Sequence, residues 1–185
     1  SGNERYYDVI QGPVHLFILD SQGATTNSTD MTNQKNWLQA QLAASTAVWK
    51  IVIDHHAPYS SCSNHGSVAA MQWPYQAWGA DAMFSGHDHT YERVVQNGFP
   101  YFVTGWSGYT LYNFGTPVTG SQVRYSTTYG AIRVDADIHT ITFTAINMNG
   151  VTVDTYTLSS NTPPVFTNDI ITKAPVEIGT AYSGT

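Results

Sequence analysis

Three short, nearly continuous apolar runs constrain the fold of this chain more than any other feature. They are Val14–Leu19, Trp49–Ile53 and Ala82–Ser85, and polar residues follow each of them. Short apolar runs between turn signals are typical of strands that are buried on both faces of a sheet. We therefore expect the three runs to be neighbours in one sheet, with the loops that follow them converging on a single pocket.

The segments between these runs carry helical signals. Ser28-Thr29-Asp30 offers side-chain oxygens that can cap a helix, and the spacing of Leu38 and Leu42 places one above the other on a helical face. The pattern predicts a helix from about Thr32 to Ala43 and a shorter one within Ala69–Trp78. Strands that alternate with helices are typical of an α/β fold.

The second half of the chain has the pattern of β-structure. Asn149-Gly150 is a strong signal for a tight hairpin turn between two strands. We expect these later strands to extend the first sheet or to face it. The expected strands include Tyr101–Val103, Ala131–Val134, Ile141–Ala145 and Val151–Tyr156.

A boundary is expected after Ser160, because the prolines of Asn161-Thr162-Pro163-Pro164 cannot continue a paired strand. Residues 1–160 are predicted to form one unit. Residues 161–185 resemble a linker followed by the opening strand or strands of an immunoglobulin-like or cadherin-like repeat of bacterial surface proteins. This second segment is too short to close a sandwich of its own.

The charge and cysteine content exclude several classes of function. The net charge is −6 and only 7 residues are Lys or Arg, so no basic stripe is expected that would attract nucleic acid. Cys62 is the only cysteine, which excludes an internal disulfide and a zinc site built from several cysteines. No apolar run is long enough to span a bilayer, and the first residues lack the regions of a signal peptide. The composition, poor in Lys and rich in Thr and Asn, resembles that of exported bacterial proteins, so we expect a secreted or cell-surface location.

Most histidines gather in the polar segments. Five of the seven lie in Asp54-His55-His56, Asn64-His65-Gly66 and Gly86-His87-Asp88-His89. Loops at the carboxyl ends of strands hold reactive side chains in α/β folds, and neutral imidazole is a frequent ligand of transition metals. The sequence thus predicts a metal site. The spacing of His87 and His89 can direct two imidazoles to one metal or to two adjacent ones.

Two of these segments carry a resemblance to a known family. The run Ser85–Arg93 resembles the G-H-x-H-x-Y-E-R segment of purple acid phosphatases and related calcineurin-like metallophosphoesterases, and Val52–His55 is similar to the V-x-x-H block of the same family. The resemblance extends from about Tyr6 to about Leu158. It implies an α/β (α+β) fold in which a β-sandwich is flanked by helices, and this chain would form only the C-terminal half of that fold.

The resemblance implies a role for each clustered histidine. His55 and His87 would be ligands of one metal, and His89 would be a ligand of the other. His65 would be catalytic, because it would bind the phosphate of the substrate or protonate the leaving group. His56 either binds substrate at the pocket wall or is a polar neighbour without a role in the reaction.

The resemblance also implies that part of the site lies outside this sequence. The family's D-x-H, G-D-x-x-Y and G-N-H-D/E blocks, which supply the bridging aspartate and other ligands, do not occur in it. Two adjacent cations need a bridging carboxylate to offset their repulsion. We therefore expect the missing N-terminal half of the catalytic domain as a partner. This chain alone is expected to be inactive and to bind at most one metal ion weakly.

Two functions from different classes follow. For the intact parent, the resemblance implies a centre of two divalent or trivalent transition metal ions, Fe, Zn or Mn, that hydrolyses phosphate monoesters as an acid phosphatase does. The alternative is a non-catalytic, β-rich module of a bacterial surface or filament protein. The repeat-like residues 161–185 and the acidic, Lys-poor composition favour that alternative.

The remaining polar residues are expected to be structural. His15 lies within the first apolar run and His139 precedes a hairpin strand, so each is predicted to be a structural or surface residue. Asp88 is expected to shape its own turn. Tyr91-Glu92-Arg93 is expected to hold the histidine loop in place through hydrogen bonds and a local ion pair.

Overall fold

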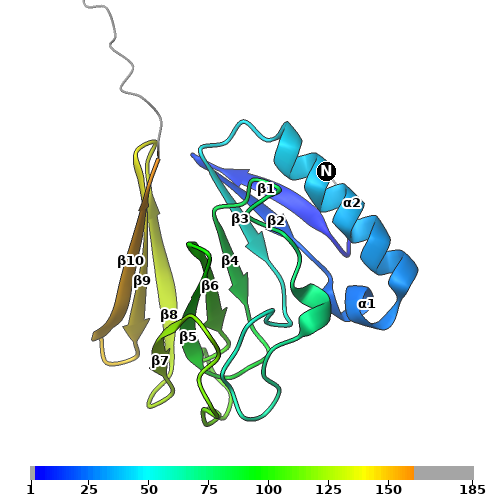
Figure 1. Cartoon of the computed structure of the whole chain (residues 1–185). Coiled ribbons are helices and arrows are strands. Elements are labelled where there is room, and N and C mark those ends of the chain that lie inside the picture. The colour runs from blue at the N-terminus through cyan, green and yellow to red at the C-terminus, as the bar shows by residue number, and fades with distance from the viewer. Residues whose placement is uncertain (1–2, 161–185) are drawn as a thin grey trace, which may run out of the picture.

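The structure, a computed structural model, describes residues 3–160 and has three layers, with helices on one side, a large sheet in the middle and a small sheet on the other side (Figure 1). The elements in chain order are β1 (Tyr7–Gln11), β2 (Val14–Ile18), α1 (Ser21–Thr26), α2 (Ser28–Ala44), β3 (Trp49–Ile53), the 3₁₀ turn η1 (Ala69–Met71), β4 (Ala82–Ser85), β5 (Tyr91–Gln96), β6 (Phe99–Thr104), β7 (Ser121–Tyr125), β8 (Gly130–Ala136), β9 (Thr140–Asn147) and β10 (Thr152–Ser159). The segment predicted to open a separate repeat, residues 161–185, lies outside the described residues.

The large sheet has the strand order β1-β2-β3-β4-β6-β5-β7, and its central strands β2, β3, β4 and β6 are parallel. The three apolar runs of the sequence form β2, β3 and β4, so the prediction that they are neighbours in one sheet is confirmed. Val52, Phe17 and Met83 face the helices and are fully buried. Ile51 and Phe102 belong to a second apolar cluster between the two sheets.

The helix predicted from about Thr32 to Ala43 is confirmed as α2, although it begins four residues earlier. Asn27 is the capping residue, because its side-chain oxygen accepts hydrogen bonds from the N–H groups of Thr29 and Asp30. Leu38 and Leu42 are both buried against the large sheet, as their spacing predicts. The short helix α1 was not predicted from the sequence.

The second predicted helix, within Ala69–Trp78, is wrong in extent, because only the single turn η1 forms there. Pro74 has no N–H group to continue a helical ladder, and the backbone passes instead through turns. The Tyr75 hydroxyl donates to the Met71 carbonyl, and both side chains are fully buried. Burial of these aromatic and sulfur-containing side chains therefore decides the path of this segment.

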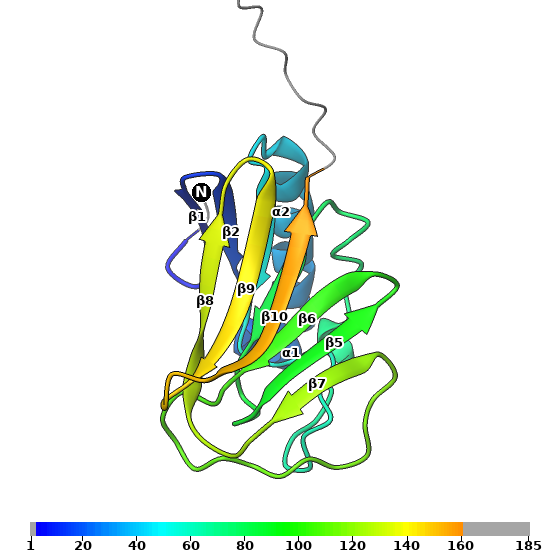
Figure 2. The same cartoon turned by 90° about the vertical axis from the view of Figure 1, so that its left-hand side faces the viewer.

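The small sheet has the order β10-β9-β8 and packs against the large one (Figure 2). Both alternatives stated for the later strands occur, because β6 extends the large sheet and β8 to β10 face it. The predicted hairpin at Asn149-Gly150 joins β9 to β10, and Gly150 adopts a positive φ of 77° that suits glycine. Phe143 of β9 packs on Phe102 of β6 with ring centroids 4.9 Å apart.

The expectation that Tyr91-Glu92-Arg93 stabilises its loop through a local ion pair is wrong. These residues begin β5, and Arg93 pairs at 2.7 Å with Asp154 of β10, which is 61 residues away in the chain. Glu92 is fully buried and accepts hydrogen bonds from the Ser61 and Ser121 hydroxyls. Both contacts join distant segments, which sequence proximity could not indicate. Within residues 3–160, no helix is long and apolar enough to cross a membrane.

Candidate metal centre

Two adjacent parallel strands place the central histidines at one edge of the large sheet. His55 follows the end of β3 and His87 follows the end of β4. The carboxyl ends of parallel neighbours lie side by side, and here backbone hydrogen bonds also join the two loops. The Asp54 N–H donates to the Phe84 carbonyl at 3.0 Å, and the Gly86 N–H donates to the His55 carbonyl at 3.1 Å.

Three imidazoles meet at this edge. The Nδ1 atom of His87 lies 3.0 Å from the Nε2 atom of His55, and one ring nitrogen from each of His55, His56 and His87 lies within 4.8 Å of the others. Zn–N bonds in proteins are about 2.0–2.1 Å long, so two nitrogens about 3 Å apart can bind the same cation. The residues present therefore fit a transition metal ion.

Local backbone geometry supports this convergence. His87 adopts a positive φ of 62°, which is uncommon for a residue other than glycine and often marks a functional position. A Cβ atom on Gly86 would lie 3.3 Å from the Nδ1 atom of His55, so glycine leaves room for that ring. Backbone and side chain together bring the two imidazoles into contact.

Ser21 is a residue of this site that the sequence reasoning missed. Its hydroxyl oxygen accepts hydrogen bonds from the backbone N–H groups of His55 and His56, and lies 2.9 Å from the Nδ1 atom of His56. Two accepted bonds occupy both lone pairs, so the hydroxyl proton is directed at Nδ1 and the other ring nitrogen of His56 carries the proton. In this tautomer His56 is a hydrogen-bond donor rather than a ligand, although its ring lies within the cluster. The only sequence signal was the position of Ser21 after the first buried strand.

The loop of His65 also joins the cluster. The ring of His65 stacks on the ring of His87 with centroids 3.9 Å apart and an interplanar angle of 28°. Asp88, which is fully buried, accepts a hydrogen bond from the Gly66 N–H at 3.1 Å. Asp88 therefore joins the His87 turn to the His65 loop.

His89 lies on the same turn but outside the three-histidine group. Its Nδ1 atom lies 2.9 Å from the Thr110 carbonyl oxygen, and because a carbonyl can only accept, Nδ1 carries the proton. This leaves Nε2 with a free lone pair, as in most metal-binding histidines. The ring stacks on Tyr112 with centroids 4.1 Å apart. Its role as a ligand of a second metal stays a prediction.

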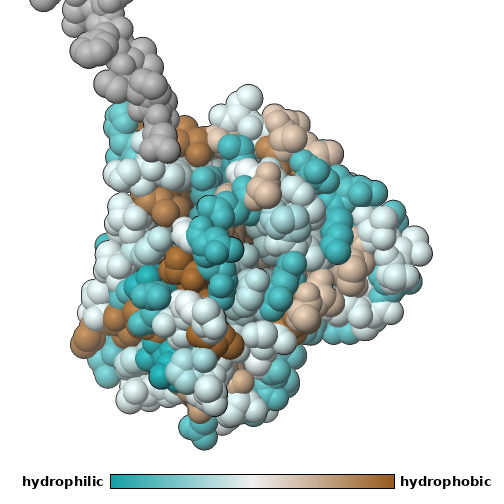
Figure 3. Space-filling model, in the orientation of Figure 1, coloured by the Kyte–Doolittle hydropathy of each residue, from teal (hydrophilic) through white to brown (hydrophobic). Residues whose placement is uncertain are grey.

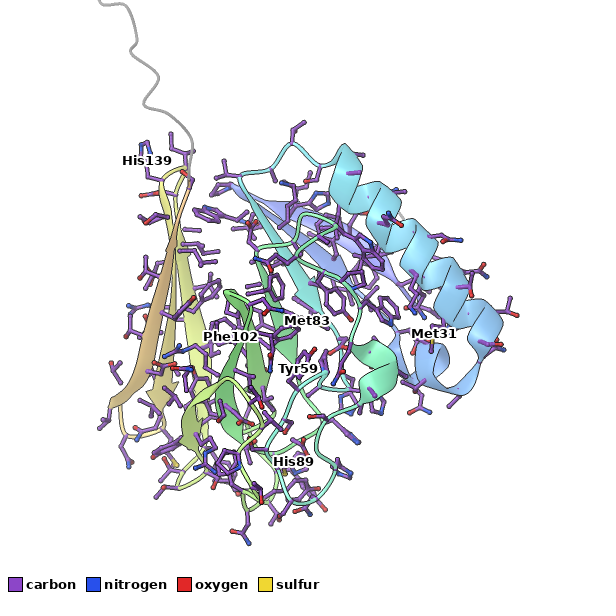
Figure 4. The ribbon with its side chains drawn as sticks, viewed as in Figure 1. Met31, Tyr59, Met83, His89, Phe102 and His139 are labelled. Carbon is purple, nitrogen blue, oxygen red and sulfur yellow. The ribbon has the colours of Figure 1, made fainter. Side chains whose placement is uncertain are left out.

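The two other histidines lie away from the cluster. His139 is at the opposite end of the molecule from His89 (Figure 4). His15 is buried within β2 and bonds to Asp8 at 2.7 Å and to the Ser45 hydroxyl at 2.8 Å. The expectation of a structural role is confirmed for His15.

Burial and the neighbouring imidazoles lower the pKa of two histidines of the group, His87 and His56. Burial, followed by the neighbouring His65, His56 and His55, lowers the pKa of His87 to about 4. Burial and the neighbouring His55 and His65 also lower the pKa of His56. Neutral imidazole is the form that binds a metal, because protonation of the ring nitrogen removes its lone pair.

Acidic side chains do not take part in this group. Among residues 3–160, it is the only set of three or more His, Cys, Asp or Glu side chains with ligand atoms this close, and all its members are histidines. Asp54 precedes His55, but its side chain is buried in the protein interior. Burial raises the pKa of its carboxyl well above the usual range, and neither carboxyl oxygen has a hydrogen-bond partner. Asp54 is therefore a buried core residue rather than a member of the histidine group.

Comparison with known proteins relates the sequence of this chain to a family. A family model described as calcineurin-like phosphoesterase matches residues 2–91. A purple acid phosphatase of Glycine max is 27% identical over 147 residues, which cover 65% of this chain and 31% of that protein. Purple acid phosphatase 4 of Arabidopsis thaliana is 31% identical over 122 residues, covering 56% and 35%. The chain thus spans about a third of the length of these relatives.

Solved structures show the same fold. Purple acid phosphatase PPD1 from yellow lupin (Lupinus luteus) seeds superposes with a TM-score of 0.70 at 20% identity, covering 83% of this chain and 32% of that one. GAP50, described as the anchor in the inner membrane complex of Plasmodium, superposes with a TM-score of 0.64 at 19% identity, covering 84% and 53%. The predicted fold class, the C-terminal part of a metallophosphoesterase-like fold, is confirmed.

Proposed function

We propose that this chain supplies the histidine half of a metal centre that hydrolyses phosphate esters. The premise is that its sequence and fold are those of a purple acid phosphatase-like metallophosphoesterase. One observation carries the proposal: His55 and His87 meet at 3.0 Å at the carboxyl ends of adjacent parallel strands. Imidazole nitrogens are frequent ligands of transition metals, and two of them this close can share one cation.

The proposed ligands follow from the free ring nitrogens. His55 Nε2 and His87 Nδ1 would hold one cation, and His89, whose Nδ1 is bonded to the Thr110 carbonyl, would offer Nε2 to the second. Imidazole donors suit Zn, Fe and Mn, among which the residues described here do not discriminate. Two cations about 3.5–4 Å apart repel each other, so a bridging carboxylate is needed between them. We place that carboxylate in the N-terminal half of the catalytic domain, outside this sequence.

The proposed substrate is a phosphate monoester. When bound, the two cations would polarise the phosphoryl group and supply an activated hydroxide. The protonated ring nitrogen of His56 would donate a hydrogen bond to a phosphoryl oxygen. His65, stacked on His87, would bind the phosphate or give a proton to the leaving group. Because burial keeps His87 and His56 neutral, both can act near neutral pH.

This chain alone is proposed to be inactive and to bind one divalent cation weakly. The three-histidine group lacks a carboxylate, and its ligands must be neutral, so its affinity for a cation should fall as the pH drops and protons compete for the ring nitrogens. Composition supports a secreted or cell-surface location.

The alternative is a non-catalytic module. GAP50, with a TM-score of 0.64 to this chain, is described as the anchor in the inner membrane complex of Plasmodium, so an anchoring role is described for one protein of this fold. On that alternative the histidines would be a remnant, and cation binding would have no consequence for activity.

The deciding experiment compares two variants in the presence of the N-terminal half. The two halves are co-expressed, and metal content and hydrolysis of p-nitrophenyl phosphate are measured. His87→Ala should abolish both, whereas His139→Ala, at the opposite end of the molecule, should change neither. Hydrolysis that survives His87→Ala would overturn the proposal. An inactive, metal-free wild-type complex would favour the module.

A further inference from the structure

A buried glutamine interrupts the apolar face of α2. The buried residues of this helix, Gln34, Leu38 and Leu42, follow each other at intervals of four and therefore line one face. Leu38 and Leu42 belong to the apolar core, whereas Gln34 is fully buried with a polar amide. The surface of the molecule on the side of α2 is largely hydrophilic or neutral, and a glutamine would be ordinary there (Figure 3). The position of Gln34 inside the protein therefore requires an explanation.

The amide of Gln34 is bonded to both backbone groups of one residue, Asp20. Its oxygen accepts a hydrogen bond from the Asp20 N–H at 3.0 Å, and its nitrogen donates to the Asp20 carbonyl at 2.9 Å. The nitrogen also donates to the Asp30 carboxylate at 3.0 Å. A buried amide costs free energy unless its hydrogen bonds are made. Here the two bonds to Asp20 replace those of a neighbouring strand, so they fix the backbone just after β2 has ended.

Asp20 directly precedes the serine that contacts the histidine loop. Ser21 is 1% exposed, and its hydroxyl oxygen accepts hydrogen bonds from the N–H groups of His55 and His56 at 3.1 and 3.0 Å. The same hydroxyl lies 2.9 Å from the Nδ1 atom of His56. A displacement of the Asp20 backbone would therefore move the hydroxyl that holds both N–H groups and the ring.

Other contacts hold the side chain of Asp20 rather than its backbone. The carboxylate accepts a hydrogen bond from the Gly23 N–H at 2.9 Å, which caps α1, and another from Arg5 at 2.7 Å. The side chain of Arg5 is 53% exposed, so solvent screens this ion pair. The position of Ser21 follows from the backbone that precedes it, which makes the buried bonds from Gln34 the more direct support.

We propose that Gln34 is a positioning residue of the candidate metal centre. It holds the Asp20 backbone, and thereby the Ser21 hydroxyl, in place. That hydroxyl in turn sets the tautomer of His56. The inference rests on the proposed function, because the tautomer matters for a reaction only if His56 donates a hydrogen bond to a phosphoryl oxygen. Proteins break their apolar pattern chiefly at functional sites, and a leucine in place of Gln34 would complete the apolar face but leave Ser21 without this support.

The test compares two variants on the same face of α2. Gln34→Met removes the three hydrogen bonds of the amide and keeps a flexible side chain of similar length. Leu38→Ala is the control, because it leaves a cavity one turn further along without removing a hydrogen bond. Both are made in residues 1–185 without metal, and thermal unfolding verifies that each folds. Ring-nitrogen NMR shifts at about pH 8, where imidazole is neutral, give the ratio of the two His56 tautomers.

Gln34→Met should raise the minor tautomer of His56 about two- to tenfold, as expected for the loss of one hydrogen bond of ordinary strength. Amide exchange of His55 and His56 should accelerate as well, since their N–H groups are bonded to the Ser21 hydroxyl. Leu38→Ala should retain the wild-type tautomer ratio although it is less stable. Gln34→Glu keeps an oxygen that can accept from the Asp20 N–H, so its ratio should lie closer to wild type than that of Gln34→Met.

A wild-type tautomer ratio in folded Gln34→Met would overturn the inference. An equal change in Leu38→Ala would also overturn it, because general loosening of the core would then explain the result. In the Ser21→Ala background, Gln34→Met should change the ratio no further, and an additional change would show that the glutamine does not act through Ser21. Should Gln34→Met fail to fold, Gln34→Asn replaces it, because its amide falls one bond length short of the Asp20 backbone.

The NMR measurements need neither metal nor hydrolysis, so they separate this inference from the proposed function. A changed tautomer ratio in Gln34→Met would retain the support of His56 by Gln34 even if hydrolysis survives His87→Ala, the result that rejects the proposed function. An unchanged ratio would reject only the role of Gln34.

Discussion

The buried carboxylate of Asp88 accepts a hydrogen bond from the Gly66 N–H at 3.1 Å and so joins two loops that are 22 residues apart. One loop carries His65 and the other carries His87, and their rings stack. The hydrogen bond therefore holds His65, which is predicted to bind the phosphate or protonate the leaving group, against His87, a predicted metal ligand. The loss of this hydrogen bond should be measurable without any metal present.

Asp88→Ala should lower the free energy of unfolding by about 1–3 kcal/mol, because the hydrogen bond from the Gly66 N–H to the buried Asp88 side chain would be lost. Amide exchange at Gly66 should accelerate in the same variant. Asp88→Asn retains a carbonyl oxygen of similar reach and should restore most of both values. Equal exchange at Gly66 in all three proteins would show that the hydrogen bond does not hold the loop.

Ser21→Ala should allow His56 to adopt both of its neutral tautomers. In the wild type the Ser21 hydroxyl is directed at Nδ1 of that ring, so the proton lies on Nε2. Nitrogen NMR shifts distinguish the two tautomers, and the variant should show a mixture where the wild type shows one. Ser45→Ala, which removes one of the two hydrogen-bond partners of His15, should leave the His56 signals unchanged. A single His56 tautomer in Ser21→Ala would contradict the proton assignment.

The ion pair between the two sheets predicts how stability depends on pH. Burial alone would raise the pKa of Asp154, but hydrogen bonds from Arg93 and Tyr91 offset this and lower it below the usual value. A lowered pKa in the folded state contributes stability above the unfolded pKa, near 3.9, and that stability is lost as the pH falls through the folded value.

Asp154→Asn should therefore destabilise the protein clearly at pH 7 and much less at pH 3, as urea unfolding at both values would measure. The matched control is Asp135→Asn, which removes an exposed pair with Arg133 and should cost less than about 1 kcal/mol at pH 7. A loss of stability in Asp154→Asn that is equal at both pH values would contradict this account of the carboxylate.

Leu38→Ala should lower the free energy of unfolding by about 2–5 kcal/mol, because the side chain is fully buried between α2 and the large sheet. Val151→Ala, which truncates a side chain that is 57% exposed, should change it by less than about 0.5 kcal/mol. Zinc titration of both folded variants should give wild-type affinity, since neither residue contacts the histidines. Weaker binding in Leu38→Ala would show that α2 helps to position the centre.

The parts of the fold that were predictable are those in which local pattern and burial agree. β2, β3 and β4 are continuous apolar runs because both faces of the sheet are covered. β1 and β7 lie at the ends of the large sheet, with several exposed residues, so they lack that signature. The extent of the helix predicted within Ala69–Trp78 was wrong because aromatic burial overrides a weak local pattern there.

In the candidate site, too, the features that local sequence indicates were predictable and those that depend on distant residues were not. Histidines after buried strands could be read from the sequence, because the topology of parallel strands brings their loops to one edge. Ser21 and Asp88 could not be assigned, since their partners His56 and Gly66 lie 35 and 22 residues away. The tautomers of His56 and His89 likewise depend on partners that only the folded chain provides.

The backbone hydrogen bonds between the loops of His55 and His87 have a consequence for how a cation would be captured. Ligands on mobile segments lose conformational entropy when a metal arrives, and that loss weakens the affinity. Here the hydrogen bonds restrict the backbone of both loops when the chain folds, so this part of the reorganisation is complete beforehand. The spacing of the two ring nitrogens should therefore favour cations whose bond lengths match it over those that bind imidazole most strongly.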